Sequence, residues 1–325
     1  MPLITLIPGD GIGQEVIPAA RLVLEALDLD LEFAEAEAGF GTFERVGTAL
    51  PEATLAQCAR SDAVLFGATS SPLGQVPGYR SPILALRRHF DLFANLRPAQ
   101  ADGIDLLIVR ENTEGLYSGR ERVEDGGQTA ITERVITVRA SERIVRLACQ
   151  QAERRRGLLT IVHKANVLKA TCGLFRQVAL DVAREFPGLT VEELLVDTAA
   201  LRLVSDPAHF DVLVTTNLFG DILSDLVAGL TGGLGLAPSA NVGAGRPAVF
   251  EPVHGSAPDI AGRGIADPRA AILSAGLLLE YLGYTEEAAR VSQITRATPH
   301  TGHTLRTAEV IARALAKGEQ WTTPT

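Results

Sequence analysis

The sequence predicts an α/β protein whose core is a large, mostly parallel sheet. Short apolar runs alternate with amphipathic stretches along most of the 325 residues, which is typical of strands joined by helices. Several runs, among them LLTIV and DVLV, are almost continuously apolar and therefore indicate buried strands. Ligands of such sheets bind beyond the carboxyl ends of the strands, so the polar residues that follow each strand are the first candidates for a site.

The elements follow one another in a regular order. Strand-like runs are expected at 3–7, 31–37, 62–68, 105–110, 158–163 and 211–216. Amphipathic or apolar helical stretches are expected at 15–27, 81–90 and 217–230. Two segments depart from this pattern. Residues 119–139 are charged, contain glycine and are only weakly strand-patterned, which predicts a protruding excursion, and the glycine-rich residues 229–245 predict a hinge or loop between domains.

The amino-acid composition argues against several classes of protein. Hydrophobic residues make up 46% of the chain, which excludes a disordered protein, and a net charge of −9 argues against nucleic acid or an anionic membrane as a partner. No apolar run approaches the ~20 residues of a membrane helix, and the N-terminus lacks a signal-peptide pattern. Cys58, Cys149 and Cys172 form no CxxC motif, which predicts buried or inert thiols in a reducing compartment. We therefore expect a soluble, cytoplasmic protein.

Two carboxylates directly follow the buried run DVLVTT. Asp221 and Asp225 are four residues apart, so they share one face of the helix that begins there, where like charges repel and favour a cation. Oxygen ligands of this kind suit Mg²⁺ or Mn²⁺, and Asp197 at the end of another apolar run is a possible third ligand. A solvated acidic face, or carboxylates that complement the helix dipole, is the alternative interpretation.

Three arginines lie next to apolar elements. Arg110 ends one strand-like run, with Tyr117 in the polar loop beyond it, and Arg87 and Arg97 flank a second segment. Each alone would more often be a surface charge. Because arginine binds carboxylates through two parallel hydrogen bonds, the three together with a metal candidate indicate a site for a polycarboxylate.

Two further segments carry candidate groups. Lys164 and Asn166 follow a strand, where the lysine is a candidate base, although an ordinary strand-end lysine has the same appearance. Asp259 in HGSAPD would accept hydrogen bonds from a ribose diol and repel a 2′-phosphate, which favours NAD over NADP; a plain turn is the alternative.

Six segments in this order resemble the β-decarboxylating hydroxyacid dehydrogenases, the family of isocitrate, homoisocitrate, 3-isopropylmalate and tartrate dehydrogenases. They are PGDGIGQEV, DLFANLRP, VRENTEGLYSG, VHKANVLK, TNLFGDILSDL and FEPVHGSAPDIAGRGIA. The resemblance spans almost the whole chain. It implies an isopropylmalate dehydrogenase-like two-domain fold, with a large mixed and mostly parallel sheet, rather than a Rossmann fold. It also implies an NAD-binding domain of residues 1–94 and 232–325, and a domain of residues 95–231 for metal binding, the clasp and dimerisation.

The resemblance also implies an activity. A 2-hydroxy acid would be oxidised by hydride transfer to NAD, its β-carboxylate would leave as CO₂, and the enolate would then be protonated. By the family's pattern Lys164 is the base and Tyr117 the acid. Lys164 and Asp197 would enter the site from the partner subunit, so the resemblance implies a homodimer or homotetramer with shared sites, in which residues 119–139 form the clasp of the dimer.

The implied site residues fall into three further sets. Those expected to bind substrate are Ser71, Arg80, Leu84, Arg87, Arg97, Arg110 and Asn166. Those expected near NAD are Ile12, His254, Gly255, Ser256, Ala257, Asp259, Ile260 and Asp267. The metal ligands for Mg²⁺ or Mn²⁺ are Asp197, Asp221 and Asp225. GDGIG lacks the GxGxxG spacing of a Rossmann phosphate loop. The resemblance implies instead that its glycines form a tight strand-to-helix turn with Ile12 near the adenosine.

The branch of the family is expected from local differences. RENTEGLYSG together with VHKANVLK resembles the homoisocitrate and NAD-isocitrate branch, and the overall pattern is most similar to homoisocitrate dehydrogenases, which form 2-oxoadipate on an aminoadipate route to lysine. Leu84, however, resembles the isopropylmalate branch, so Arg80 would have to supply the cation for a distal carboxylate. Isopropylmalate and isocitrate remain alternative substrates. A non-catalytic regulatory subunit is a remote alternative, because Tyr117, Lys164 and the aspartates are all present. Asp267 replaces the asparagine common in GIANP, which alters a contact to adenine.

Overall fold

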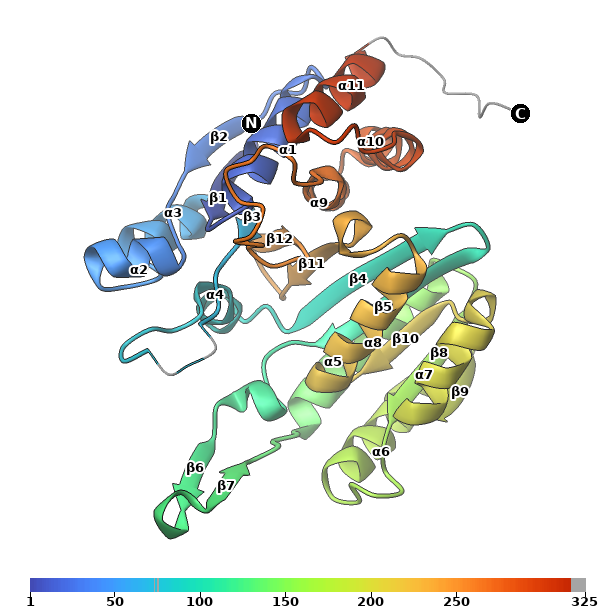
Figure 1. The fold of residues 1–325 in the computed structure, drawn as a ribbon. Coiled ribbons are helices and arrows are strands. Elements are labelled where there is room, and N and C mark those ends of the chain that lie inside the picture. The colour runs from blue at the N-terminus through green and yellow to red at the C-terminus, as the bar shows by residue number, and fades with distance from the viewer. Residues whose placement is uncertain (73, 75, 317–325) are drawn as a thin grey trace. The chain divides into compact units, whose positions relative to one another are not determined.

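The computed structural model describes residues 1–72, 74 and 76–316, and the chain divides into two compact units. The first comprises Met1–Phe90 and Leu234–Thr325, and the second comprises Asp91–Gly233. The predicted fold class is confirmed: the protein is α/β with a large mixed and mostly parallel sheet (Figure 1). The assignment of NAD binding to one unit and of metal binding and dimerisation to the other stays a prediction.

The first unit holds five strands in the order β2-β1-β3-β12-β11. Their bounds are β1 (Leu3–Gly9), β2 (Glu32–Glu35), β3 (Ala63–Ala68), β11 (Pro238–Val242) and β12 (Ala248–Pro252). All pairings are parallel except that of β11 with β12. Part of the glycine-rich segment 229–245 is therefore a strand and not a loop. Pairing with the distant β12, which no local pattern shows, decides this.

Helices complete the first unit. They are α1 (Gly13–Glu25), α2 (Phe40–Val46), α3 (Glu52–Arg60), α4 (Pro82–His89), η4 (Leu234–Leu236), α9 (Arg269–Leu282), α10 (Thr285–Ala297) and α11 (Thr304–Ala316). Helix α1 forms because apolar side chains recur at helical spacing, and Val16, Ala20 and Val23 are all fully buried. Helices α1 and α9 pack on the strands, while α10 and α11 pack on these two helices.

The second unit repeats this plan with the order β4-β5-β10-β8-β9. Its strands are β4 (Ala94–Ala101), β5 (Ile104–Glu111), β8 (Leu158–His163), β9 (Thr190–Leu195) and β10 (Val212–Thr215). Of these five strands, only β4 runs antiparallel to its neighbour. The register pairs Thr215 with both Arg110 and Val162. The polar residues that end β5, β8 and β10 therefore lie at one edge of the sheet.

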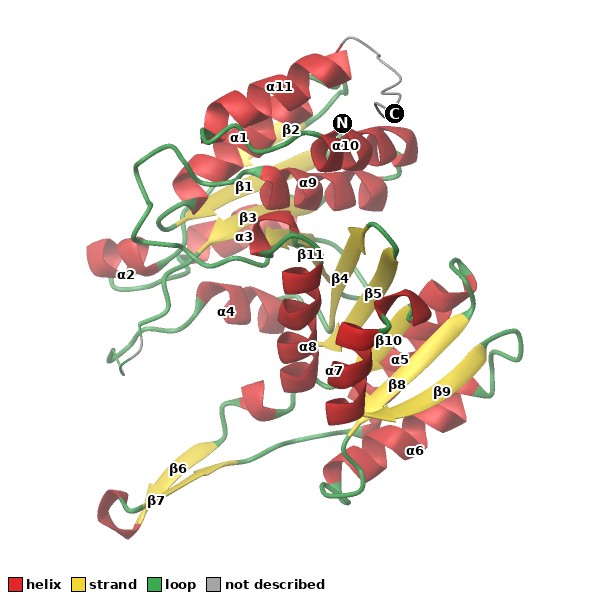
Figure 2. Ribbon diagram, turned by 45° about the vertical axis from the view of Figure 1, so that its right-hand side comes forward, coloured by secondary structure: helices red, strands yellow, loops and turns green. Residues whose placement is uncertain are grey.

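Helices cover both faces of this second set of strands. They are α5 (Val138–Glu153), α6 (Thr171–Ala183), α7 (Val196–Ser205) and α8 (Asn217–Leu230), with the short helices η1 (Leu116–Ser118) and η3 (Pro207–His209) between elements. Helices α5 and α6 pack together on one face, and α7 and α8 pack together on the other (Figure 2). Helix α8 contacts β4, β5 and β10, so it carries its side chains over the strands that hold Arg97 and Arg110.

The segment 119–139 contains an exposed hairpin. Strands β6 (Glu121–Glu124) and β7 (Thr129–Thr132) pair antiparallel around the short helix η2 (Asp125–Gly127) and form a two-stranded sheet of their own. The hairpin extends away from the rest of the second unit (Figure 1). Its service as the clasp of a dimer stays a prediction.

The three cysteines are buried and form no disulfide. Burial raises the pKa of the Cys58 thiol to about 12 and that of Cys149 to about 11, so both are protonated and unreactive at neutral pH. Across the described residues no helix combines the length and the hydrophobicity that membrane crossing requires.

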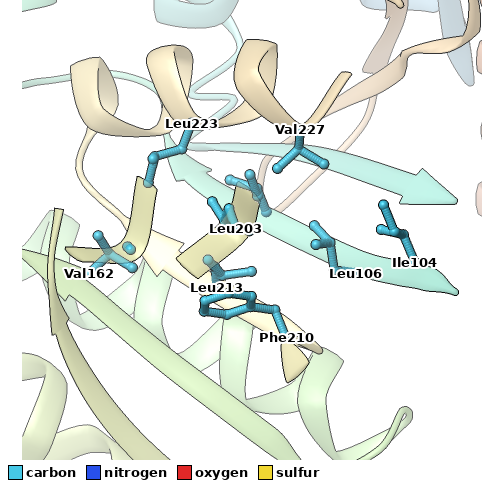
Figure 3. Close-up of a cluster of buried hydrophobic side chains, with 10 residues drawn as sticks. Ile104, Leu106, Val162, Leu203, Phe210, Leu213, Leu223 and Val227 are labelled. Atoms are coloured by element: carbon cyan, nitrogen blue, oxygen red, sulfur yellow. The ribbon is translucent and has the colours of Figure 1, made fainter. Parts of the chain in front are cut away.

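The core of the second unit includes a cluster under α7 and α8 (Figure 3). Its members are Ile104, Leu106, Ile108, Val162, Ala199, Leu203, Phe210, Leu213, Leu223 and Val227. Phe210 is fully buried there, in the turn that leads into β10. The cluster therefore joins the helices to the strands whose ends carry the polar residues.

We expect Phe210→Ala to lower the free energy of unfolding by about 3–5 kcal/mol, because a ring-sized cavity is left among these side chains. Leu305, which is 55% exposed on α11, offers a control whose change to alanine should cost less than about 0.5 kcal/mol. Urea unfolding of both variants measures the difference. Equal losses would contradict the role given to this cluster.

Candidate active site

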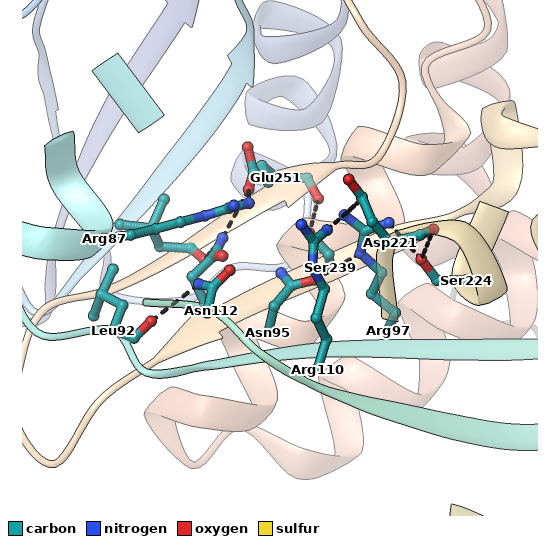
Figure 4. A network of polar contacts seen from close by, with 12 residues as sticks. Arg87, Leu92, Asn95, Arg97, Arg110, Asn112, Asp221, Ser224, Ser239 and Glu251 are labelled. Carbon is teal, nitrogen blue, oxygen red and sulfur yellow. Dashed lines mark hydrogen bonds and ion pairs between the residues drawn. The ribbon is translucent and has the colours of Figure 1, made fainter. Parts of the chain in front are cut away.

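Two arginines and two aspartates form a cluster on the face of the second unit that α8 covers. Arg97 on β4 and Arg110 on β5 point to the same face, since β4 places Asn95 opposite Arg110 and two residues before Arg97. The Arg97 guanidinium lies 3.3 Å from the Asp221 carboxylate and 3.2 Å from that of Asp225 (Figure 4). Arg110 forms a further ion pair with Asp221. The structure thus brings together four of the predicted residues.

Arg110 is only 1% exposed, so its charge needs close partners. The Asn217 side-chain oxygen accepts hydrogen bonds from its Nε and from a terminal nitrogen, at 3.1 and 2.8 Å. The aliphatic stem of Arg110 passes against Gly220, where a Cβ atom would lie 2.6 Å from Arg110 Cγ. Glycine at position 220 is therefore required for the arginine to reach Asp221.

Arg97 is held in the same way by uncharged groups. Its Nε donates to the Asn95 side-chain oxygen at 2.6 Å, and one terminal nitrogen donates to Ser224 Oγ at 2.6 Å. Asn95 is fully buried and Ser224 nearly so. The arginine is therefore fixed in direction before any ligand binds.

Tyr117 joins this cluster through η1. Its hydroxyl donates a short hydrogen bond to Asp221, and the guanidinium carbon of Arg110 lies 5.2 Å from the centre of its ring. Burial, followed by the hydrogen bond and charge of Asp221, raises the pKa of the Tyr117 hydroxyl above its ordinary value. Burial and the neighbouring carboxylate therefore both favour the protonated form of the side chain.

The acidic pair on α8 is partly offset by these cations. Burial above all, together with the charge of Asp221, raises the pKa of the Asp225 carboxyl, while Arg97 acts in the opposite direction. The predicted repulsion between the two carboxylates is present. The counter-charges that the structure supplies are arginines, which the spacing of the aspartates alone did not indicate.

Lys164 and Asp197 form a second, separate pair. Lys164 follows β8, Asp197 lies in the first turn of α7, and Lys164 Nζ is 2.5 Å from Asp197 Oδ1. This hydrogen bond is the main reason why the pKa of Asp197 is lowered. Asn166 is exposed two residues beyond the lysine. In the part of the chain that the structure describes, no three His, Cys, Asp or Glu side chains are placed to hold one metal ion.

In the first unit the glycines of GDGIG form the turn from β1 to α1. A Cβ on Gly11 would lie 2.1 Å from the Ser256 carbonyl oxygen, and one on Gly9 would lie 2.0 Å from that of Ala68. The backbone nitrogen of Ile12 donates to the Ser256 oxygen at 2.9 Å. The glycines are therefore needed because backbone of the same unit packs directly against the turn.

Asp10 has a structural role that the sequence reasoning missed. Its carboxylate accepts hydrogen bonds from the backbone nitrogens of Phe40 and Gly41 at the start of α2, and from that of Ser70 after β3. It thus satisfies donors at a helix N-terminus from a different part of the chain. The only local signal is an acidic residue between two glycines.

The loop at 254–260 contains a buried polar atom that lacks a hydrogen-bond partner among the described residues. His254 Nδ1 lies 3.0 Å from the Gly255 carbonyl oxygen and donates to it, and burial lowers the pKa of the ring, which is therefore neutral. His254 Nε2 is left as a buried acceptor that has no hydrogen-bond partner among the described residues. Ser256 Oγ bonds Ser70 Oγ at 3.0 Å, and Asp259 is exposed.

The remaining residues that are predicted to lie near the cofactor differ in their exposure and in the hydrogen bonds that they already form. Gly255 is exposed, Ala257 and Ile260 are half-buried, and the Ile12 side chain is 5% exposed. The Asp267 carboxylate is occupied by Arg269, which donates to it from Nε, from a terminal nitrogen and from its backbone. Position 267 therefore anchors the start of α9.

The predicted substrate residues of the first unit centre on Arg87. It is 7% exposed on α4 and bonds Glu251 Oε1 at 2.9 Å, while its Nε has no hydrogen-bond partner within the described ranges (Figure 4). Leu84 lies one turn earlier and is half-buried. Arg80 and Ser71 are exposed. Glu251 also accepts a hydrogen bond from Asn241, and both were missed because buried polar residues in strands are recognised only by their partners.

Comparison with known proteins identifies the family to which the chain is similar. Residues 3–323 match a family profile described as isocitrate/isopropylmalate dehydrogenase. The chain is 58% identical over 298 residues to the isocitrate/homoisocitrate dehydrogenase of Thermus thermophilus, covering 89% of this chain and 88% of that protein. It is 50% identical over 327 residues to the 3-isopropylmalate dehydrogenase of Archaeoglobus fulgidus, covering 95% and 97%. The crystal structure of isocitrate dehydrogenase from Methylococcus capsulatus matches with a TM-score of 0.91 at 40% identity, covering 97% and 100%.

We expect Gly220→Ala to destabilise the protein by about 1–3 kcal/mol, because the new methyl group meets the stem of the buried Arg110. Gly229→Ala in the same helix is the matched control: no atom lies within 4 Å of its added Cβ, so a gain of up to about 1 kcal/mol is expected from helix propensity. Urea unfolding separates the two. The account of Arg110 fails if both variants are equally stable.

Proposed function

Since the chain belongs to the isocitrate/isopropylmalate dehydrogenase family, which carries out oxidative decarboxylation of small hydroxy acids, we propose that it oxidises homoisocitrate to 2-oxoadipate with NAD and Mg²⁺ or Mn²⁺. The observation that carries the proposal is the cluster of Arg97, Arg110, Asp221 and Tyr117. It places two fixed cations for carboxylates and a protonated acid each within hydrogen-bond distance of one oxygen ligand, Asp221.

The residues fit a divalent cation. Asp221 and Asp225 are oxygen donors on adjacent turns of α8, and their side chains are 32% and 54% exposed, so both can still be reached by a ligand. Asp197 would complete the ligand set from the partner subunit. When bound, the cation would supply Lewis-acid stabilisation of the negative charge that develops on the substrate.

The residues also fit NAD. The buried Nε2 of His254 could accept a hydrogen bond from a donor such as a ribose hydroxyl. The exposed Asp259 would accept hydrogen bonds from a ribose diol and repel a 2′-phosphate. The dinucleotide would supply the hydride acceptor. Asp267 is a weaker candidate for a contact to adenine, because Arg269 already occupies its carboxylate.

The chain's own residues would bind the acid and move its protons. Arg87, Arg97 and Arg110 would bind its carboxylates, a role that the unpartnered Nε of Arg87 supports. Lys164 would take the proton of the substrate hydroxyl, and Tyr117 would give its proton to the enolate carbon after CO₂ leaves. The raised pKa of Tyr117 keeps this proton available across the neutral range.

We further propose a homodimer or homotetramer in which Lys164 and Asp197 serve the partner's site. Three large apolar side chains on α7 and α8, namely Leu201, Val204 and Ile222, are each more than half exposed, which supports a protein interface there. The proposal includes a reducing, cytoplasmic location, in keeping with three cysteines that form no disulfide.

The choice of substrate depends on the group by which the candidate acids differ, which bears a carboxylate in homoisocitrate and is an isopropyl group in 3-isopropylmalate. Homoisocitrate needs a cation for a third carboxylate, and Arg80 is exposed and pairs with no carboxylate in the described part of the chain. The name of the relative from Thermus thermophilus, isocitrate/homoisocitrate dehydrogenase, supports this choice. Leu84, one turn from Arg87, instead favours an apolar arm, so 3-isopropylmalate is the second candidate.

We expect kcat/KM with NAD and Mn²⁺ to be highest for homoisocitrate among homoisocitrate, 3-isopropylmalate and isocitrate. Arg80→Ala should lower the homoisocitrate value at least roughly tenfold, the effect of losing a hydrogen bond to a charged group, while activity on isopropylmalate changes little. Arg306→Ala, at another exposed arginine, is the control. A dominant activity on isopropylmalate that Arg80→Ala leaves intact would overturn the homoisocitrate proposal.

Two single variants test the proton-transfer roles. Tyr117→Phe and Lys164→Ala should each lower kcat by about 10²–10⁴-fold, the range for loss of a general acid or base. If the site is shared, a mixture refolded together should regain about a quarter of wild-type activity, because half of the dimers are mixed and each has one intact site. No recovery in a mixture shown to contain mixed dimers would contradict the shared site.

A further inference from the structure

His163, the last residue of β8, is a buried ring directly before Lys164. Its side chain is 7% exposed, and its two ring nitrogens face different partners. Nδ1 lies 3.2 Å from the backbone nitrogen of Ala165, and Nε2 lies 3.3 Å from Glu193 Oε2 on β9. Each contact constrains the position of the ring's proton.

The two contacts together fix one tautomer. A backbone N–H can only donate, so Nδ1 must be the unprotonated acceptor of the Ala165 N–H. The proton is then on Nε2, from which it is donated to the Glu193 carboxylate. A doubly protonated ring would place two N–H groups against each other at Ala165. Burial lowers the pKa of His163, which agrees with a neutral ring.

Glu193 is itself held in place. Arg176 on α6 approaches it with Nε 2.5 Å from Oε2 and donates from a terminal nitrogen to Oε1 at 2.8 Å. The strand register places Glu193 beside Ile161, two residues before the histidine on β8. The chain of contacts from α6 through β9 therefore ends on the ring of His163.

The ring's other contact lies in the turn that carries Lys164. The Lys164 carbonyl accepts from the nitrogens of Val167 and Leu168 on one side of the peptide, and the Ala165 nitrogen on the other side donates to the ring. The peptide between Lys164 and Ala165 is thus held at both its oxygen and its nitrogen. Its orientation determines the direction in which the lysine leaves the strand.

We propose that His163 is a positioning residue, whose neutral ring accepts the Ala165 N–H and thereby fixes the direction of the Lys164 side chain. The proposal rests on the proposed function in one respect, the use of Lys164 as the base. It needs no contact between the histidine and substrate, and it explains why a polar ring is buried at the end of an apolar strand.

Two substitutions separate the two contacts of the ring. In His163→Asn the side-chain oxygen takes the place of Nδ1 and can accept from Ala165, but the side chain cannot reach Glu193. In His163→Gln the longer amide takes the place of Nε2, reaching Glu193 without serving Ala165. The two variants are similar in polarity and differ in which contact they keep.

We expect His163→Gln to lower kcat roughly tenfold or more with little change in KM for the acid, because a misdirected base impairs the chemical step and not binding. His163→Asn should restore kcat to within about threefold of wild type. Equal losses in both variants, or no loss in either, would overturn the proposal. Similar melting temperatures show that the split does not come from stability.

Two measurements on the protein without substrate keep this result distinct from the proposed function. Hydrogen exchange at the Ala165 amide should be slow in wild type and His163→Asn and fast in His163→Gln. The ¹⁵N shifts of the wild-type His163 ring should show the proton on Nε2. A proton on Nδ1 would overturn the proposal even if no variant folds. Failure of the wild type to oxidise any of the three acids would refute the proposed function alone.

Discussion

The buried charge of Arg110 is the constraint on which the second unit's cluster depends. A guanidinium removed from water is tolerated only when carboxylates and hydrogen-bond acceptors surround it, since its desolvation costs several kcal/mol. Asp221 and Asn217 supply these groups from the first turns of α8, and Gly220 lets the stem pass. This arrangement sets the rotation and height of α8 on the sheet, and therefore the direction of both aspartates.

The positions of the other polar groups follow from that docking. Once α8 is fixed, Asp221 is held within reach of Tyr117, and Ser224 meets Arg97 one turn further along. Two cations and two carboxylates nearly cancel one another.

In the first unit the main constraint is the close packing of one backbone segment against another. Its glycine turn is held against Ser256 and Ala68 at distances that exclude any side chain, and Asp10 within the turn ties down the starts of α2 and of the segment after β3. The turn is therefore a rigid support for the loop that carries His254 and Asp259. Nucleotide contact is not needed to explain the glycines.

The α/β class and the four residues at the centre of the arginine–aspartate cluster can be predicted from the sequence alone. The alternation of apolar and amphipathic runs is a local property of the chain. Charged residues that follow apolar runs are likewise visible in the sequence as candidates for a site. Arg97, Arg110, Tyr117 and Asp221 all lie at the ends of apolar runs or in the segments that follow them, but this pattern does not give their arrangement in space.

The pairing of these groups depends on the three-dimensional fold. Ser224 lies 127 residues from Arg97, and Asn217 lies 107 residues from Arg110, so no local pattern could pair them. The same holds for β11, which is a strand because β12 is beside it. The tautomer of His163 likewise depends on Glu193 from the next strand. Hydrogen bonds and packing are formed across space, and a sequence shows the groups but not the distances between them.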